Sequence, residues 1–224
     1  MNTFELRNIS KVFFNNNVEV EVVKNTNITI PDRTFSAIVG PSGSGKSTLL
    51  TMLGALQKPT TGELRFGETI LSTKNSKDLS NYRFTEIGFI LQASNLIPYL
   101  TLFEQYKLRY KYANRRVDKK RISEVFESLS IDKIQHKYPE EISGGERQRA
   151  AIGLALLLKP RVILADEPTA SLDTEKAYDV IEIFKKITTE SETSVIMVTH
   201  DTRMLEYCDQ VFEMRDGNLR LIET

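Results

Sequence analysis

A glycine-rich segment at residues 40–48 reads GPSGSGKST and matches the pattern GxxxxGK[ST]. Glycines let the backbone wrap closely around a polyphosphate, and consecutive amides at the start of a helix attract anions. We expect Lys46 to reach the β- and γ-phosphates, the Ser47 hydroxyl to bind Mg²⁺ and Thr48 to contact the α-phosphate. The segment predicts nucleotide binding by Gly40, Pro41, Ser42, Gly43, Ser44, Gly45, Lys46, Ser47 and Thr48.

Two adjacent carboxylates, Asp166 and Glu167, follow an apolar run in the segment RVILADEP. A carboxylate at Asp166 can hold Mg²⁺ through its water shell, and Glu167 can orient and polarise an attacking water. The same letters also fit an ordinary Asp-Glu turn before a proline. The phosphate-binding segment favours the catalytic interpretation, in which one charge serves the metal and the other the nucleophile.

Four short apolar runs are each followed by a glycine or by polar residues. The runs are 36–39, 87–91, 162–165 and 195–198. In the same order, they are followed by Gly40, by Gln92, by Asp166 with Glu167, and by Thr199 with His200. Continuous apolar runs are typical of parallel strands that are buried on both faces. Ligands bind at the carboxyl ends of such strands, so we expect one site at one edge of a sheet.

The remaining periodicity predicts further strands and helices. Residues 4–14 and 18–30 read as strands, and in the second Val18, Val20 and Val22 alternate with glutamates, as in a sheet with one solvated face. Apolar spacing predicts helices over 46–56 and 174–188. Residues 93–160 are charged and helically spaced, and we expect a helical subdomain there, inserted into the sheet domain.

The composition limits the possible functions. The chain has 224 residues, 40% hydrophobic and 27% charged, which is ordinary for a globular protein with a core. Its 30 basic residues balance 30 acidic ones, which argues against a nucleic-acid-binding protein. Cys208 is the single cysteine, so no internal disulfide is possible. The longest apolar stretch, 150–158, is too short to span a bilayer, and we expect no signal peptide.

The segment ISGGERQR at residues 142–149 completes a known pattern. With the phosphate-binding segment and LADEPTASLD, it resembles the ABC (ATP-binding cassette) ATPase family over nearly the whole chain. The resemblance implies ATP hydrolysis with ATP and Mg²⁺ as cofactors. It also implies an α/β fold of the P-loop NTPase (RecA-like) type, with a parallel sheet core, an antiparallel β subdomain and an inserted α-helical subdomain. In this single domain, 1–224, the core comprises 1–92 and 161–224, and the helical signature subdomain comprises 93–160.

By this resemblance, Ser143, Gly144 and Gly145 cap the γ-phosphate of ATP held by a second, facing ATPase domain. A hydroxyl and glycine amides near a helix N-terminus are suitable ligands for an anion. The same letters also read as a plain helix cap, in which Ser143 pairs with Glu146. The two interpretations are compatible.

Other residues receive roles from the resemblance alone. Gln92 would contact Mg²⁺ and the attacking water, and would couple the site to a transmembrane partner. Asp173 would bridge the dimer interface, and His200 would bond the γ-phosphate and hold Glu167 in register. Phe13 aligns with the aromatic residue that stacks on adenine, with Phe14 as a rival. The implied catalytic residues are Lys46, Gln92, Glu167 and His200, and the implied metal ligands are Ser47, Gln92 and Asp166.

The segments LADEPTASLD, TTGELRFGETILS and IGFILQASNLIPYLTLFEQ most resemble one subgroup of the family. It contains the ATPases of lipoprotein-release, macrolide or peptide export, and antimicrobial-peptide resistance systems. The similarity implies a cytoplasmic subunit, peripheral on the inner face of the cell membrane, that drives an integral-membrane permease. It would pair with a copy of itself or with a homologous ATPase, and would bind no nucleic acid. We expect an exporter of peptide, lipoprotein or drug type. The alternative is an ATPase that drives a non-transport membrane complex, in cell division, cell-wall hydrolase regulation or peptide sensing.

Residues 107–121 contain eight basic residues and one acid, Asp118. The simpler interpretation is a solvated helix face or loop. A second interpretation is that this stretch lies near anionic lipid headgroups, because the resemblance places it in the subdomain that faces the permease.

Overall fold

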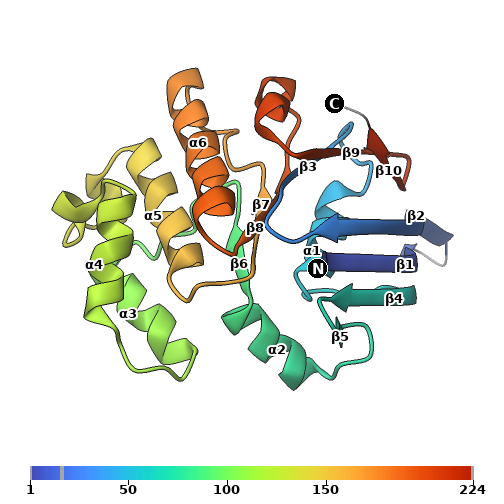
Figure 1. The fold of residues 1–224 in the computed structure, drawn as a ribbon, viewed down its shortest axis with the longest axis horizontal. Coiled ribbons are helices and arrows are strands. Elements are labelled where there is room, and N and C mark those ends of the chain that lie inside the picture. Colours follow the sequence, from blue (N-terminus) through green and yellow to red (C-terminus); the bar gives the residue numbers. More distant parts are fainter. Residues whose placement is uncertain (1, 16–17, 223–224) are drawn as a thin grey trace.

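A six-stranded sheet forms the centre of the computed structural model, which describes residues 2–15 and 18–222 (Figure 1). Its strand order is β10-β9-β3-β8-β7-β6. The strands from β9 to β6 run parallel, and β10 pairs antiparallel with β9. The strands are β3 (Phe35–Val39), β6 (Ile87–Ile90), β7 (Val162–Asp166), β8 (Ser194–Val198), β9 (Gln210–Arg215) and β10 (Asn218–Ile222).

The inner strands are apolar throughout because both faces of the sheet are covered. In β7, Ile163 and Ala165 belong to one buried cluster, whereas Val162 and Leu164 belong to another. Helix α6 (Thr174–Glu190) packs on the first face. Its predicted apolar stripe is confirmed, since these side chains are buried: Ala177, Val180, Ile181, Phe184 and Ile187.

A second, antiparallel sheet covers the other face together with helix α1 (Lys46–Leu53). Its order is β2-β1-β4-β5, from β1 (Asn2–Asn15), β2 (Val18–Pro31), β4 (Thr61–Phe66) and β5 (Thr69–Ile70). The rings of Phe4 and Phe66 lie 5.0 Å apart in the cluster that also contains Leu49 of α1. The mainly parallel central sheet, the antiparallel sheet and the helices packed on them confirm the predicted fold class.

Residues 93–160, all of which the structure describes, contain helices and no strand. They comprise α3 (Leu102–Tyr112), α4 (Lys119–Ser128), two short 3₁₀ turns (Asp132–Ile134 and Pro139–Glu141) and α5 (Gly144–Leu156). Tyr106 joins the three helices: its ring stacks on Phe126 of α4 at 4.5 Å, and its hydroxyl donates to the Ala150 carbonyl of α5 at 2.9 Å. Helix α2 (Ser76–Thr85) and a 3₁₀ helix (Thr202–Tyr207) complete the fold.

Two local expectations need correction. The helix predicted over 46–56 ends at Leu53, because Gly54 caps it and Ala55 adopts a left-handed φ of 54°. The alternation in β2 predicts valines on a covered face, but Val18 and Val20 are 62% and 45% exposed. They lie at the end of the β1–β2 ribbon that projects beyond the core (Figure 1).

Candidate functional site

Three parallel strands end beside the loop of residues 40–48. Gly40 follows β3, Glu167 follows β7, and His200 comes two residues after β8. Because these strands are neighbours in the sheet, their carboxyl ends meet at one edge. They enclose a cavity of about 470 Å³, a size suited to a small ligand. The lining residues are Val22, Gly40, Ser42, Gly43, Gly45, Lys46, Ser47, Thr48, Glu167, Val198 and His200.

The backbone of the loop needs glycine at two close approaches. A Cβ at Gly40 would lie 2.0 Å from the carbonyl oxygen of Met214, and Gly45 begins α1 with a φ of 105°. The amides of the first helical turn have no acceptor within the helix, and Leu49 is the first residue that donates to its own helix, to the Gly45 carbonyl at 2.9 Å. The first turn, which is fully described, contains no acid, so its positive end suits an anion.

Lys46 points back over this loop. Its ammonium donates to the carbonyl oxygens of Gly40 at 2.8 Å and Pro41 at 2.9 Å, and the residue is buried. These two bonds hold the positive charge beside the amides at the start of α1. A polyphosphate in the cavity would therefore meet a lysine and a row of amide donors on the same side.

Ser47 lines the cavity and lies beside Asp166, the last residue of β7. The Ser47 hydroxyl donates to Asp166 Oδ1 at 3.3 Å. Burial raises the pKa of Asp166 above its ordinary value of 3.8, the Ser47 hydrogen bond lowers it, and the neighbouring charge of Glu167 raises it further. A hydroxyl and a carboxylate fit Mg²⁺, which binds few protein oxygens and takes its other ligands from water and phosphates. The donor set in this corner therefore fits the implied metal.

Glu167 and His200 form a pair at the mouth of the cavity. His200 Nδ1 lies 2.9 Å from Glu167 Oε2, and the histidine side chain is 71% exposed while that of the glutamate is 19% exposed. Glu167 has a φ of 48°, an uncommon conformation for a residue other than glycine. Its amide donates to the Val198 carbonyl at 3.0 Å, which fixes it to β8. The backbone thus turns the carboxylate toward His200.

The structure does not bring every predicted residue to this cavity. Gln92 and Gly144 line a separate cavity of about 460 Å³, together with Gln148 and Ser171. Ser143 caps α5 in the predicted capping box: its amide donates to Glu146 Oε2 at 2.7 Å, and its hydroxyl accepts from the Glu146 amide at 3.3 Å. The two interpretations of this segment therefore remain compatible.

Gly145 and Asp173 meet through one lysine. A Cβ at Gly145 would lie 2.8 Å from Cδ of Lys176, and the Lys176 ammonium pairs with the Asp173 carboxylate. Asp173 also caps α6 by accepting from the Lys176 amide at 3.0 Å. The predicted signature and interface residues thus form a second group, away from the residues that line the phosphate-loop cavity.

The adenine contact remains a prediction. Phe13 is 38% exposed with Lys11 Nζ 5.1 Å from its ring centre, and Phe14 is 73% exposed. Among the described residues that line the phosphate-loop cavity, the antiparallel sheet contributes Val22 and neither phenylalanine. Sequence reasoning missed Val22, because nothing in the alternation of β2 distinguishes it from Val20.

The comparisons with known proteins agree with this arrangement. Residues 23–170 match the family model described as ABC transporter. The chain is 40% identical over 220 residues to the "putative hemin import ATP-binding protein HrtA" of Staphylococcus haemolyticus, covering 97% of this chain and 99% of the relative. A protein of the same name from Staphylococcus aureus (strain bovine RF122) is 40% identical over 203 residues, covering 90% and 91%.

Solved structures give the same result. The fold is similar to the ATP-binding cassette MJ0796 in a dimeric post-hydrolysis state bound to ADP and Pi, with a TM-score of 0.89, 32% identity and 98% of both chains covered. It is also similar to cbiO1 of Clostridium perfringens, part of an ABC transporter complex, with a TM-score of 0.87, 25% identity and 98% and 87% covered. Within the described residues, no helix has the length and hydrophobicity needed to cross a membrane. The family model and the relatives at 40% identity show that the chain belongs to the ABC transporter family, as an ATP-binding and ATP-hydrolysing cassette.

Proposed function

We propose that this chain and a second cassette, either a copy or a homologue, close around two MgATP and drive a membrane permease. The observation that carries the proposal is the separation of two phosphate-binding groups on one chain. Lys46 and Glu167 line one cavity, whereas Gly144 and Ser171 line another. A facing chain can place its signature over the ATP on the first chain's loop. The relative MJ0796 is described as a dimer bound to ADP and Pi.

The phosphate loop binds the nucleotide. Lys46 exchanges its bonds to the Gly40 and Pro41 carbonyls for bonds to phosphate oxygens, and the first amides of α1 donate to the same groups. Ser47 and Asp166 would hold Mg²⁺, which neutralises phosphate charge when bound. The nucleotide is then oriented with its γ-phosphate toward the carboxyl ends of β7 and β8.

Glu167 orients the water that attacks the γ-phosphate in line with the bond to the β-phosphate, which breaks. His200 holds the Glu167 carboxylate at 2.9 Å and extends toward the γ-phosphate. Ser143 and Gly145 of the facing cassette donate to that phosphate from the start of α5. When the phosphate leaves, the contacts that join the two cassettes are lost and the pair reopens.

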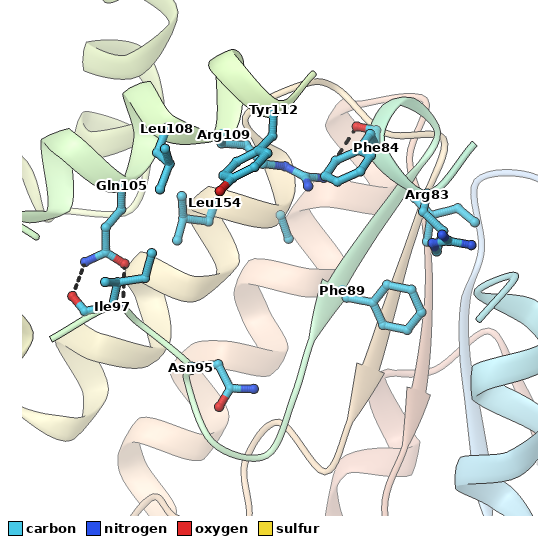
Figure 2. Close-up of a pocket in the computed structure, with 12 residues that line it drawn as sticks. Arg83, Phe84, Phe89, Asn95, Ile97, Gln105, Leu108, Arg109, Tyr112 and Leu154 are labelled. Carbon is cyan, nitrogen blue, oxygen red and sulfur yellow. Dashed lines mark hydrogen bonds between the residues drawn. The ribbon is translucent and has the colours of Figure 1, made fainter. Parts of the chain in front are cut away.

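We place the permease contact at a groove of about 400 Å³ between the sheet core and the helical region (Figure 2). Its walls carry Phe84 and Phe89 on the core side, and Leu108, Tyr112 and Leu154 on the helical side. These side chains suit the apolar face of a helix. Such an occupant would press on both parts of the chain at once.

The groove is linked to Gln92 by the segment between β6 and α3. Asn95 and Ile97 of that segment line the groove. Gln105 fastens Ile97 to α3, since it accepts from the Ile97 amide at 2.9 Å and donates to its carbonyl at 3.2 Å (Figure 2). A shift of α3 therefore pulls on the segment that carries Gln92.

Arg109 gives the groove a specific chemistry. Its guanidinium lies 5.4 Å from the Phe84 ring and donates weakly to the Phe84 carbonyl at 3.4 Å (Figure 2). Its buried Nε has no hydrogen-bond partner within residues 2–15 and 18–222. Burial lowers the pKa of Arg109, which reflects the cost of holding this charge away from water. A permease helix that carries a carboxylate at this point would satisfy the guanidinium.

The cargo and its direction form the finer part of the proposal. The sequence predicts an exporter of peptide, lipoprotein or drug type. Relatives at 40% identity carry hemin import in their printed names, which makes hemin the first cargo to test and leaves the direction to be measured. Those transport names favour a transporter over the alternative of a non-transport membrane complex.

The test is co-purification of the tagged chain from its own membranes, followed by reconstitution of the complex in vesicles loaded with hemin. We expect a multi-span membrane protein to co-purify, and ATP to drive hemin movement that stops in the Glu167→Gln variant. Hydrolysis with no associated membrane protein would contradict the proposal. Hemin movement that is equal in the variant would contradict it as well.

A further inference from the structure

We propose that the helical region carries a docking surface for anionic membrane lipid, formed by the end of α3, the start of α4 and the loop between them. We call this surface the basic end, and it consists of exposed cations: Lys107, Lys111, Arg115, Arg116, Lys119 and Lys120. The proposal rests on the proposed function in one respect, because the permease is what brings the chain to a membrane.

The described part of the chain offers these cations no acidic partner. Within residues 2–15 and 18–222, none of the six forms an ion pair, whereas the neighbouring Arg121 pairs with Glu124 at 3.8 Å. The two nearby acids are engaged: Asp118 accepts from the Arg121 amide at 3.0 Å, and Glu104 accepts from the Thr101 amide at 2.9 Å. The chain as a whole is neutral, so this excess of positive charge is local and favours an external anion.

The shape of the basic end favours lipid over a free anion. Lys107, Lys111, Arg115 and Arg116 surround a hollow of about 540 Å³. Its other lining residues are Leu100, Leu108, Val117 and one acid, Glu104, whose carboxylate is engaged with Thr101. Cations around an aliphatic floor match a headgroup phosphate with its glycerol and the first acyl carbons.

The position of the basic end fits the proposed permease contact. Leu108 of α3 lines both the hollow and the groove, so the two surfaces adjoin. Helices α3 and α4 lie at the opposite end of the molecule from the antiparallel sheet (Figure 1). A permease helix in the groove and lipid headgroups at the basic end can therefore be bound at the same time. Binding to the bilayer would then raise the effective concentration of the cassette at its permease.

The test is flotation of the full chain with vesicles of phosphatidylcholine alone or of phosphatidylcholine with phosphatidylglycerol. We expect binding to the anionic vesicles only, weakened by salt. A variant with Arg115, Arg116, Lys119 and Lys120 changed to Gln should bind at least about tenfold more weakly, since each basic residue near an anionic surface contributes on the order of fivefold. A matched control changes Lys58, Lys77, Lys186 and Arg215 to Gln, which removes the same charge elsewhere and should leave vesicle binding unchanged.

An equal loss of vesicle binding in both quadruple variants would show that binding depends on net charge alone, and would overturn the proposal. Binding of the wild-type chain to RNA but not to anionic vesicles would also overturn it, as would competition by inorganic phosphate beyond that of chloride at equal ionic strength. ATP hydrolysis by the isolated chain is measured in parallel and should be unchanged in both variants. If the chain hydrolyses ATP but does not bind anionic vesicles, only the proposal of a lipid-binding surface is contradicted. If the chain binds anionic vesicles but drives no transport, only the proposed function is contradicted.

Discussion

His200 Nδ1 and Glu167 Oε2 lie 2.9 Å apart, although the two residues belong to different strand ends. The contact depends on the left-handed backbone of Glu167 and on the pairing of β7 with β8, which fixes the two strand ends side by side. The glutamate is the more buried partner, and the histidine reaches outward from it. This geometry suits a carboxylate that orients water and an imidazole that holds the carboxylate in place.

The Glu167→Gln variant should bind ATP normally and hydrolyse it at least about a hundredfold more slowly, because the amide cannot accept the proton of the attacking water. The bound ATP should then persist and stabilise a dimer. Turnover and size-exclusion chromatography with MgATP measure the two effects. The exposed Glu68→Gln variant is the control, and normal turnover in Glu167→Gln would remove that residue from its proposed role.

Replacing His200 by Ala should lower kcat by about ten- to a hundredfold with a smaller change in KM, because Glu167 loses its only side-chain partner among the described residues. A His200→Gln variant retains a donor and should recover part of kcat. Steady-state kinetics at saturating ATP measure both variants. An unchanged kcat in the alanine variant would contradict the pairing as a functional contact.

Asp166→Asn should stabilise the chain in the absence of Mg²⁺ and nucleotide while it abolishes Mg-dependent hydrolysis. The folded-state pKa of Asp166 is raised, so the folded protein binds the proton more tightly than the unfolded chain and stability falls as pH rises above about 3.8. At neutral pH the ionised side chain therefore costs stability, and removing the charge should raise Tm by about 1–3 °C. The gain should shrink as pH falls through the raised pKa.

The matched control for Asp166 is Asp209→Asn. Asp209 accepts from the Phe35 amide at 2.8 Å and pairs with Lys185, so its loss of charge should lower Tm. Thermal unfolding of both variants across pH is the measurement. A fall in Tm for Asp166→Asn at neutral pH would contradict the cost assigned to its charge.

Arg109→Met should leave hydrolysis by the isolated chain unchanged and weaken its association with the permease. The buried Nε has no hydrogen-bond partner among the residues that the structure describes, so the substitution removes a desolvated charge and should keep or raise Tm. Co-purification with the permease should fall, whereas an exposed control, Arg215→Met, should not change it. If the Arg109→Met variant co-purified with the permease as well as the wild type does, the groove would not be the permease-binding site.

The residues that the sequence placed correctly at one edge share a local signal. Gly40, Glu167 and His200 each follow an apolar run, and parallel strands bring such ends together whatever lies between them. Gln92 follows such a run too, but it lines a different cavity. Its position depends on how the segment between β6 and α3 crosses to the helical region, and no local pattern determines that path.

Some features that the sequence analysis did not predict have a recognisable sequence pattern, and others have none. Asp216 and Gly217, with φ of 49° and 81°, form the tight turn between β9 and β10, and an Asp-Gly pair between apolar strands predicts such a hairpin. Val22 had none, since it reaches the phosphate-loop cavity only through the packing of the antiparallel sheet. Lys176 also had none, because its contact with Gly145 joins segments that are distant in the sequence.

The central claim is that each reaction centre is completed by a facing cassette, and Ser143→Asp tests it most directly. Aspartate caps a helix as well as serine does, so α5 should stay intact and Tm should change little. The new negative charge would meet the γ-phosphate held by the facing chain. ATP binding to the chain's own loop should therefore be kept, while hydrolysis falls at least about a hundredfold.

The chain offers a matched control in Thr101→Asp, which makes the same kind of change at the capping box of α3. That variant should keep its hydrolysis rate, with a small loss of stability because aspartate cannot donate the bond that the Thr101 hydroxyl gives to Glu104 Oε2 at 2.8 Å. The measurement is steady-state ATP hydrolysis by both variants beside the wild type. Loss in Ser143→Asp alone is the predicted result, and undiminished hydrolysis in a folded Ser143→Asp variant would contradict the shared reaction centre.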